Sequence, residues 1–206
     1  MKPYYHDDWV TIYHGHCGDV IVKNVTEWGN IDLVLTDPPY GLGDKWQGGK
    51  AKWPLHHGQM AWDASIVEGL AEIIKIGRQQ IVWGGHLYPL PIGRGWLVWD
   101  KLERNDAFTS GQGELAWTNL EQPVKIFRKH LTAIMSTGKV HPTQKPIQLM
   151  TWCMKFTDGG TVLDPFMGSG TTLRAAKDLK RRAIGIEIEE KYCEIAARRM
   201  SQEVLI

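Results

Sequence analysis

Short apolar runs alternate along this chain with segments whose apolar residues recur three or four positions apart. The runs at 31–36 and 80–83 are almost continuously apolar, which is typical of strands covered on both faces of a sheet. The spacing within 65–77 is that of an amphipathic helix, with Ser65 as its expected N-cap. Further strands are predicted at 10–17, 95–100, 161–163 and 183–188, and further helices after Gly18-Asp19 and at 147–156, 171–179 and 189–200. This alternation predicts an α/β fold with a mostly parallel sheet and helices on both faces.

Two regions interrupt the alternation. The runs at 115–118 and 124–128 follow each other closely and predict an antiparallel hairpin at the edge of the sheet. Residues 41–62 form a long polar stretch rich in Gly, Lys, Trp and His. Loops of this length inside a compact domain tend to be functional lids or disordered segments.

The composition is that of one globular domain spanning residues 1–206, with 43% hydrophobic and 23% charged residues. No apolar run approaches the roughly 20 residues that cross a bilayer, and the first residues lack a signal-peptide pattern. The three cysteines are scattered, as in proteins of a reducing compartment, so a cytoplasmic location is expected.

The net charge of +1 conceals a local bias, because residues 122–157 contain no Asp or Glu. Lysines also crowd the segment 45–52. Local basic patches bind phosphates even when the whole chain is nearly neutral, although such a patch can equally be a solvated surface.

A glycine-rich segment runs from Asp164 to Thr172, between a predicted strand and a predicted helix. Gly168 and Gly170 permit a tight turn and close backbone approach, and the helix N-terminus favours a carboxylate or phosphate. The next strand ends at Glu187, where a nucleoside ribose is usually held. The pattern Gly-x-Gly-x-x-Gly of dinucleotide sites is absent, so the segment indicates a different nucleoside cofactor. The alternative is a helix-capping turn followed by a surface Glu.

The segment Asp37-Pro38-Pro39-Tyr40 closes another apolar run. An exocyclic amine on a base is a poor nucleophile, since its lone pair is conjugated into the ring. The Asp37 carboxylate and the Pro38 carbonyl can each accept one of its N–H bonds, and Tyr40 can stack on the base. The two prolines stiffen the backbone and add no donors. The segment therefore indicates a site for a planar, amino-bearing substrate, and its alternative is a plain strand exit.

Together with His141-Pro142-Thr143-Gln144-Lys145-Pro146, these motifs resemble the S-adenosylmethionine-dependent amino-methyltransferases of DNA. The substrate motif precedes the cofactor motif, which resembles the beta, circularly permuted class. The resemblance extends over about residues 9–200 and is closest to small phage or prophage members. It implies a Rossmann-like methyltransferase fold with a seven-stranded, mostly parallel sheet and an antiparallel edge hairpin.

The resemblance implies transfer of a methyl group from S-adenosylmethionine to N6 of adenine in duplex DNA, leaving S-adenosylhomocysteine. Asp37, Pro38, Pro39 and Tyr40 are then the catalytic residues. The residues that the resemblance assigns to the cofactor are Asp19, Asp164, Pro165, Phe166, Gly168, Ser169, Gly170, Thr171, Thr172, Glu187, Thr143 and Lys145. Without the family, Asp19 reads as a helix cap.

A base inside a duplex has to leave the stack before it reaches such a pocket. The residues expected to hold the DNA are Lys45, Lys50, Lys52, Lys125, Arg128, Lys129 and Lys139. Trp46 or Trp53 could close over the flipped nucleotide. A short target-recognition insert is expected around 102–140, and a homodimer is a family expectation only. A partner nuclease and the recognised sequence do not follow from the chain.

Three alternatives remain open. Cytosine-N4 methylation uses the same geometry, a non-catalytic nucleotide- or DNA-binding domain retains the fold, and protein-glutamine methyltransferases share a related loop in the opposite motif order. His14, His16 and Cys17 are close in sequence, but no matching ligand cluster accompanies them, so no metal is expected.

Overall fold

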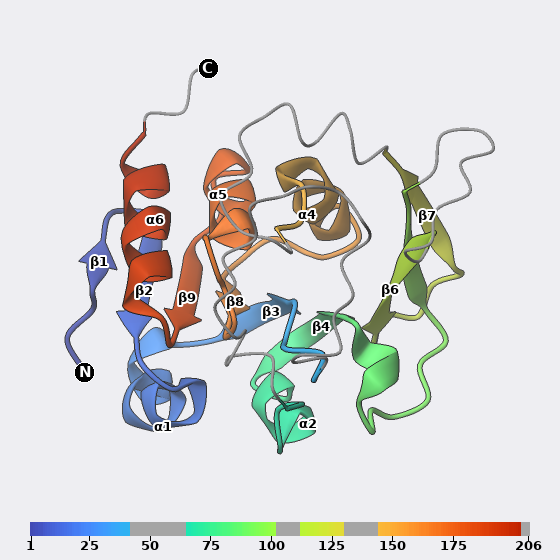
Figure 1. Cartoon of the computed structure of the whole chain (residues 1–206), viewed down its shortest axis with the longest axis horizontal. Coiled ribbons are helices and arrows are strands. Elements are labelled where there is room, and N and C mark those ends of the chain that lie inside the picture. The colour runs from blue at the N-terminus through green and yellow to red at the C-terminus, as the bar shows by residue number, and fades with distance from the viewer. Residues whose placement is uncertain (42–64, 102–111, 130–143, 203–206) are drawn as a thin grey trace, which may run out of the picture.

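The computed structural model describes residues 1–41, 65–101, 112–129 and 144–202. These residues form three layers, with one sheet between two layers of helices (Figure 1). Within the described ranges, no helix is long and apolar enough to cross a membrane.

The sheet contains nine described strands in the order β1-β2-β9-β8-β3-β4-β6-β5-β7. Their bounds are β1 Tyr5–His6, β2 Val10–His14, β3 Ile31–Thr36, β4 Gly77–Trp83, β5 Trp96–Asp100, β6 Gly113–Thr118, β7 Lys125–Arg128, β8 Val162–Asp164 and β9 Ala183–Glu187. The central strands β2, β9, β8, β3 and β4 are all parallel, so their carboxyl ends meet at one edge of the sheet.

Helices cover both faces of this sheet. On one face lie α4 Ile147–Met154, α5 Thr171–Asp178 and α6 Glu190–Ser201, whereas α1 Cys17–Trp28 and α2 Leu70–Ile74 lie on the other with the short 3₁₀ turn η3 Gly85–Leu87 (Figure 1). Each face has its own buried cluster, one containing Leu149, Leu173 and Ala196, and the other Val20 and Ile74. The strands are apolar on both faces because both faces are buried, as the sequence predicted.

The fold class is confirmed, with corrections in detail. Nine strands are present where seven were expected, because the short β1 pairs with β2 at one edge and β7 extends the other edge. The predicted hairpin between 115–118 and 124–128 is wrong, since β5 lies between β6 and β7 and pairs with both. Leu97 and Trp99 of β5 are buried, whereas Ile126 of β7 is 50% exposed. The more apolar strand therefore takes the inner position.

Two boundaries also differ from expectation. The helix predicted over 65–77 is confined to Leu70–Ile74, and its N-cap is Gly69 rather than Ser65. Gly69 has a φ of 70°, a left-handed conformation that glycine adopts without strain, so the helix starts there. The first long strand ends at His14, and Cys17 already belongs to α1.

Candidate active site

The two predicted motifs leave adjacent strands at the same edge of the sheet. Asp37 follows β3 and the glycine-rich segment follows β8, and these strands are parallel neighbours. The Thr36 hydroxyl donates a hydrogen bond of 2.7 Å to Asp164 Oδ1, which joins the two strand ends. The substrate motif and the cofactor motif therefore face one common region, as two motifs at the ends of parallel strands should.

The Asp37 carboxylate has two partners in the described part of the chain. The Tyr40 hydroxyl donates to Asp37 Oδ1 over 2.7 Å, and Lys145 Nζ lies 2.5 Å from Asp37 Oδ2. The same ammonium group donates to the Tyr40 hydroxyl over 3.2 Å. These contacts fix both the carboxylate and the aromatic ring of the substrate motif.

The backbone of this motif is also held from behind. The Tyr88 hydroxyl donates to the Pro39 carbonyl. Gly84, at φ 67°, lies so close to the Tyr40 ring that a Cβ there would be 2.2 Å from Cε1. Only glycine leaves room for the ring at this strand exit.

Lys145 is a deeply buried charged residue of the site, with 4% of its side chain exposed. Its ammonium contacts Asp37 and lies 2.9 Å from Glu114 Oε2, whereas the resemblance had assigned it to the cofactor. Glu114 also pairs with Lys101. Glu114 was not among the residues predicted for the site, although an acid inside an otherwise apolar strand is a signal that a cation lies nearby.

The pKa values in this cluster reflect burial and pairing. Burial raises the pKa of Asp37, and the negative charge of Glu114 adds to this rise, against the effect of Lys145. Burial would also raise the pKa of Glu114, but the ammonium groups of Lys145 and Lys101 lower it to about 2. The Lys145 pKa is held well above its usual value by Asp37 and Glu114 despite the opposing effect of burial.

The glycine-rich segment is built around two acids. Asp164 Oδ1 accepts the backbone N–H of Phe166 over 3.1 Å as well as the Thr36 hydroxyl. Glu187 Oε2 accepts the N–H of Gly168 over 3.0 Å, which links the end of β9 to the turn. Gly168 and Gly170 have φ values of 51° and 78°, the left-handed conformations that the motif implied.

The turn leaves space on one side and is tightly packed on the other. A Cβ on Gly168 would meet nothing within 4 Å, whereas a Cβ on Gly170 would lie 2.9 Å from Ala196 Cβ of α6. Ser169 donates to the Gln144 side chain over 3.3 Å. Arg199 donates to the Thr171 hydroxyl over 3.2 Å, so α6 supports the turn from behind. Gln144 lies in the motif at 141–146 but was not predicted as a site residue, and Arg199 carries no sequence signal that marks this role.

Asp19 is exposed in the first turn of α1. The N-cap of α1 is His16, which makes no side-chain capping bond, so the capping interpretation of Asp19 is not supported. His14 and Glu187 are paired residues of β2 and β9, and the Gly15 N–H donates to the Glu187 carbonyl over 2.9 Å. The start of α1 therefore adjoins the end of β9, where Glu187, the acid predicted to bind the cofactor, lies.

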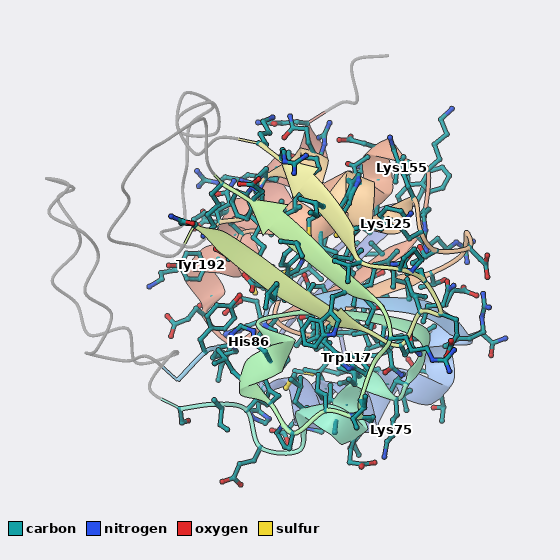
Figure 2. The ribbon with its side chains drawn as sticks, turned by 90° about the vertical axis from the view of Figure 1, so that its right-hand side faces the viewer. Lys75, His86, Trp117, Lys125, Lys155 and Tyr192 are labelled. Atoms are coloured by element: carbon teal, nitrogen blue, oxygen red, sulfur yellow. The ribbon has the colours of Figure 1, made fainter. Side chains whose placement is uncertain are left out.

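The predicted DNA-binding residues are placed only in part. Arg128 ends β7 at the same edge of the sheet as the active site and pairs with Asp100 over 3.1 Å, with Lys129 next to it. Lys125 begins β7, away from that edge, and is seen on the outermost strand in Figure 2. The other residues predicted to contact DNA lie outside the described residues, as does much of the expected insert; they are Lys45, Lys50, Lys52, Lys139, Trp46 and Trp53. Thr143, which was predicted to bind the cofactor, also lies outside them.

The buried Asp164 gives a testable dependence of stability on pH. Burial raises its pKa from 3.8 to about 6, so the folded chain binds this proton more tightly than the unfolded chain does. The free energy of unfolding should therefore fall as the pH rises from about 4 to about 6, by about 3 kcal/mol in all, since one pKa unit corresponds to about 1.4 kcal/mol. Asp164→Asn should be more stable than the wild type by up to about this amount at pH 8, and similar to it near pH 4.

Urea denaturation without cofactor at both pH values measures this difference. The control is Asp158→Asn, an exposed acid paired with Arg78 at the surface. A gain in stability at pH 8 that equals the gain at pH 4 would contradict the role of the buried charge.

The N6/N4 methyltransferase family, described as DNA methylase, matches residues 91–198, just over half of the chain. The chain belongs to this family of DNA methylases. The family predicted from the motifs, S-adenosylmethionine-dependent DNA amino-methyltransferases, is thereby confirmed, and S-adenosylmethionine as cofactor with it.

Known relatives of this methylase cover most of its length. It is 27% identical to the type II methyltransferase M.HpaI of Haemophilus parainfluenzae, over 91% of this chain and 74% of that protein. It is 24% identical to the type II methyltransferase M.ScaI of Streptomyces caespitosus, over 98% of this chain and 84% of that protein.

Two solved structures share its fold. The M1.HpyAVI–SAM complex superposes with a TM-score of 0.63 at 22% identity, covering 92% of this chain and 99% of that one. The cytosine-N4-specific PvuII DNA methyltransferase gives a TM-score of 0.63 at 15% identity, covering 100% and 90%. The fold is therefore the Rossmann-like fold of DNA methyltransferases.

Proposed function

We propose that this DNA methylase transfers a methyl group from S-adenosylmethionine to N6 of adenine in a base flipped out of duplex DNA. The observation that carries the proposal is the position of Asp37 and Asp164 at the carboxyl ends of adjacent strands, joined through Thr36. Acceptors for an amine thereby lie beside a turn suited to a nucleoside. The adenine assignment rests on Asp rather than Ser before the Pro-Pro-Tyr sequence.

The residues at the glycine-rich turn fit S-adenosylmethionine. Glu187 presents a carboxylate at the end of β9, where ribose hydroxyls can donate to it. The open space beside Gly168 admits a ligand against the backbone, and the exposed Asp19 flanks the same strand end. The backbone N–H groups at the start of α5 suit the methionine carboxylate. We assign Asp19, Glu187 and the turn from Asp164 to Thr172 to the cofactor on this basis.

The bound cofactor supplies an electrophilic methyl group on a positively charged sulfur. Asp37 and the Pro38 carbonyl accept the two N–H bonds of the target amine and draw its lone pair out of the ring. Held in this way, the amine nitrogen would direct its lone pair at the methyl carbon, and the cofactor would supply the methyl group and keep the electron pair of the carbon–sulfur bond on sulfur. The amine then loses one proton, which Asp37 can receive and pass to solvent. Tyr40 holds the base by stacking, so positioning contributes much of the rate.

The DNA contacts are proposed from charge. Arg128 and Lys129 lie at the active-site edge and are suited to phosphates, and Lys125 adds a cation further along β7. The lysines at 45, 50, 52 and 139 belong to the same proposal from sequence. Flipping the base costs a few kcal/mol, which contacts of this kind have to offset.

The motif order and the sheet order also support a circularly permuted chain. The first long strand, β2, lies beside the last, β9, and the substrate strand β3 precedes the cofactor strand β8 in sequence. A chain that began at β8 would have its cofactor motif first.

The test is transfer of labelled methyl groups from S-adenosylmethionine to duplex DNA, followed by digestion to nucleosides. We expect label in N6-methyldeoxyadenosine, reduced about 10³-fold or more with Asp37→Ala. Label in N4-methyldeoxycytidine would assign the cytosine alternative, and cofactor binding without any transfer would favour a non-catalytic domain. Sequencing of the modified DNA then gives the recognised site.

A further inference from the structure

A chain of four alternating charges extends from the substrate motif into the sheet. Lys145 Nζ lies 2.5 Å from Asp37 Oδ2 and 2.9 Å from Glu114 Oε2, and Glu114 in turn pairs with Lys101. The charges of these four residues sum to zero. None of the proposed catalytic steps uses Glu114 or Lys101.

The topology explains why Glu114 reaches this site. β6 runs antiparallel to β4 and β5, so its amino-terminal residues lie at the edge where the parallel strands have their carboxyl ends. Glu114 is paired with Trp99, two residues before Lys101. Because β6 is antiparallel, an acid near its amino end lies at the edge where Asp37 lies. In a parallel strand, an acid would have to be near the carboxyl end to reach this edge.

Burial makes this arrangement demanding. The Lys145 side chain is 4% exposed, and those of Lys101, Asp37 and Glu114 are 16%, 23% and 24% exposed. A buried ammonium has to be matched by nearby carboxylates, and a single buried partner would hold it tightly. With two carboxylates, the Lys145 ammonium is shared between Asp37 and Glu114.

We propose that Glu114 is a positioning residue for methyl transfer. It holds the Lys145 ammonium beside Asp37 and, by sharing this ammonium, leaves part of the Asp37 carboxylate available as a hydrogen-bond acceptor. The inference rests on the function proposed above and names a residue of that same site. The positive charge of Lys145 favours the ionised form of Asp37, and Glu114 weakens the ion pair between Lys145 and Asp37 by forming a second one. The Asp37 oxygens thus retain acceptor capacity for the target amine. With Glu114 neutral, Lys145 has Asp37 as its remaining carboxylate partner in this cluster and competes with the substrate.

The charged and titratable groups around Asp37 give the sign of the effect. Lys145 precedes α4, Glu114 belongs to β6, Tyr40 lies on the loop after β3, and Asp164 ends β8. Neutralising Glu114 removes a negative charge, so the pKa of Asp37 should fall. Neutralising Lys145 removes a positive charge, so the pKa of Asp37 should rise.

The experiment compares Glu114→Gln and Lys145→Gln with the wild-type chain. The first measurement is the pH titration of the Asp37 carboxyl by ¹³C NMR without cofactor, with Asp37→Asn used to assign the signal. We expect shifts in opposite directions, of about one pH unit each. NMR distinguishes Asp37 from Asp164, whose pKa lies at about 6.

The second measurement is kcat and KM against pH. The acidic limb of the kcat–pH profile should move to lower pH in Glu114→Gln and to higher pH in Lys145→Gln. At the optimum, Glu114→Gln should lower kcat about tenfold, the effect of one charge-assisted hydrogen bond, and leave KM for S-adenosylmethionine nearly unchanged. The double variant should lose little more activity than Lys145→Gln alone, since Glu114 acts through Lys145.

Glu121→Gln is the matched control, because Glu121 is an exposed acid that pairs with Arg94 on the surface. A shift of Asp37 in the same direction in both variants, or a tenfold rise in KM for S-adenosylmethionine with kcat intact, would overturn the inference. Opposite NMR shifts in a wild-type chain that transfers no methyl group would support the charge network and refute the proposed function instead.

If Glu114→Gln does not fold, Lys101→Gln tests the same charge network. This variant retains the ion pair between Glu114 and Lys145. Loss of the Lys101 cation leaves Glu114 more strongly drawn to Lys145. The acidic limb should then move to higher pH, and an unchanged limb would count against the network.

Discussion

Replacing Asp37 with alanine is expected to reduce methyl transfer by about 10³-fold or more while leaving the dissociation constant for S-adenosylmethionine nearly unchanged. In the proposed mechanism Asp37 supplies the carboxylate that draws the amine lone pair out of the ring, and no other described carboxylate can replace it without a shift of β8 or β6. Asp164 is already engaged with Thr36 and Phe166, and Glu114 with Lys145 and Lys101. Single-turnover kinetics with labelled cofactor and a separate binding titration measure the two effects.

Asp37→Asn is the matched variant, because it keeps the shape and one acceptor oxygen but loses the charge that faces Lys145. We expect activity between that of the wild type and Asp37→Ala. Alanine also leaves Lys145 with one carboxylate fewer, so the melting temperature of each variant has to accompany the kinetics. Turnover by Asp37→Ala within tenfold of the wild type would remove Asp37 from the catalytic assignment.

Replacing Glu187 with alanine is expected to weaken S-adenosylmethionine binding by about 10- to 100-fold, the scale of a hydrogen bond to a charged group. Glu187 accepts the Gly168 N–H over 3.0 Å and the Glu189 N–H over 2.8 Å, so it shapes the turn in addition to the ribose contact proposed for it. Burial raises the pKa of its carboxyl, and these backbone N–H groups counter the rise. Calorimetry at pH 8 measures the dissociation constant.

Glu194→Ala is the control for this substitution, because Glu194 lies on the exposed side of α6 and pairs with Arg198. Surface pairs of this kind contribute little to stability, so the control should bind like the wild type. An unchanged dissociation constant in Glu187→Ala would exclude the ribose role. Saturating cofactor should restore much of the turnover of Glu187→Ala, in contrast to Asp37→Ala.

The sequence determined the layer structure of this methylase because its signals are local. Apolar runs such as 31–36 need two covered faces, and a glycine-rich turn between a strand and a helix needs left-handed backbone at Gly168 and Gly170. The parallel order of the strands then requires the ends of β3 and β8 to face the same edge. For this reason the local patterns are sufficient to predict that Asp37 and Asp164 belong to one site.

Tertiary structure alone decided which partners these residues have. No local pattern predicts that β5 lies between β6 and β7, because this strand order depends on burying Leu97 and Trp99 between the layers. The antiparallel run of β6 follows from the same choice, and it brings Glu114 to Lys145, 31 positions away in the sequence. A charge inside the protein is stabilised by whatever opposite charge folding brings within a few ångströms, and that distance is a property of the packed chain.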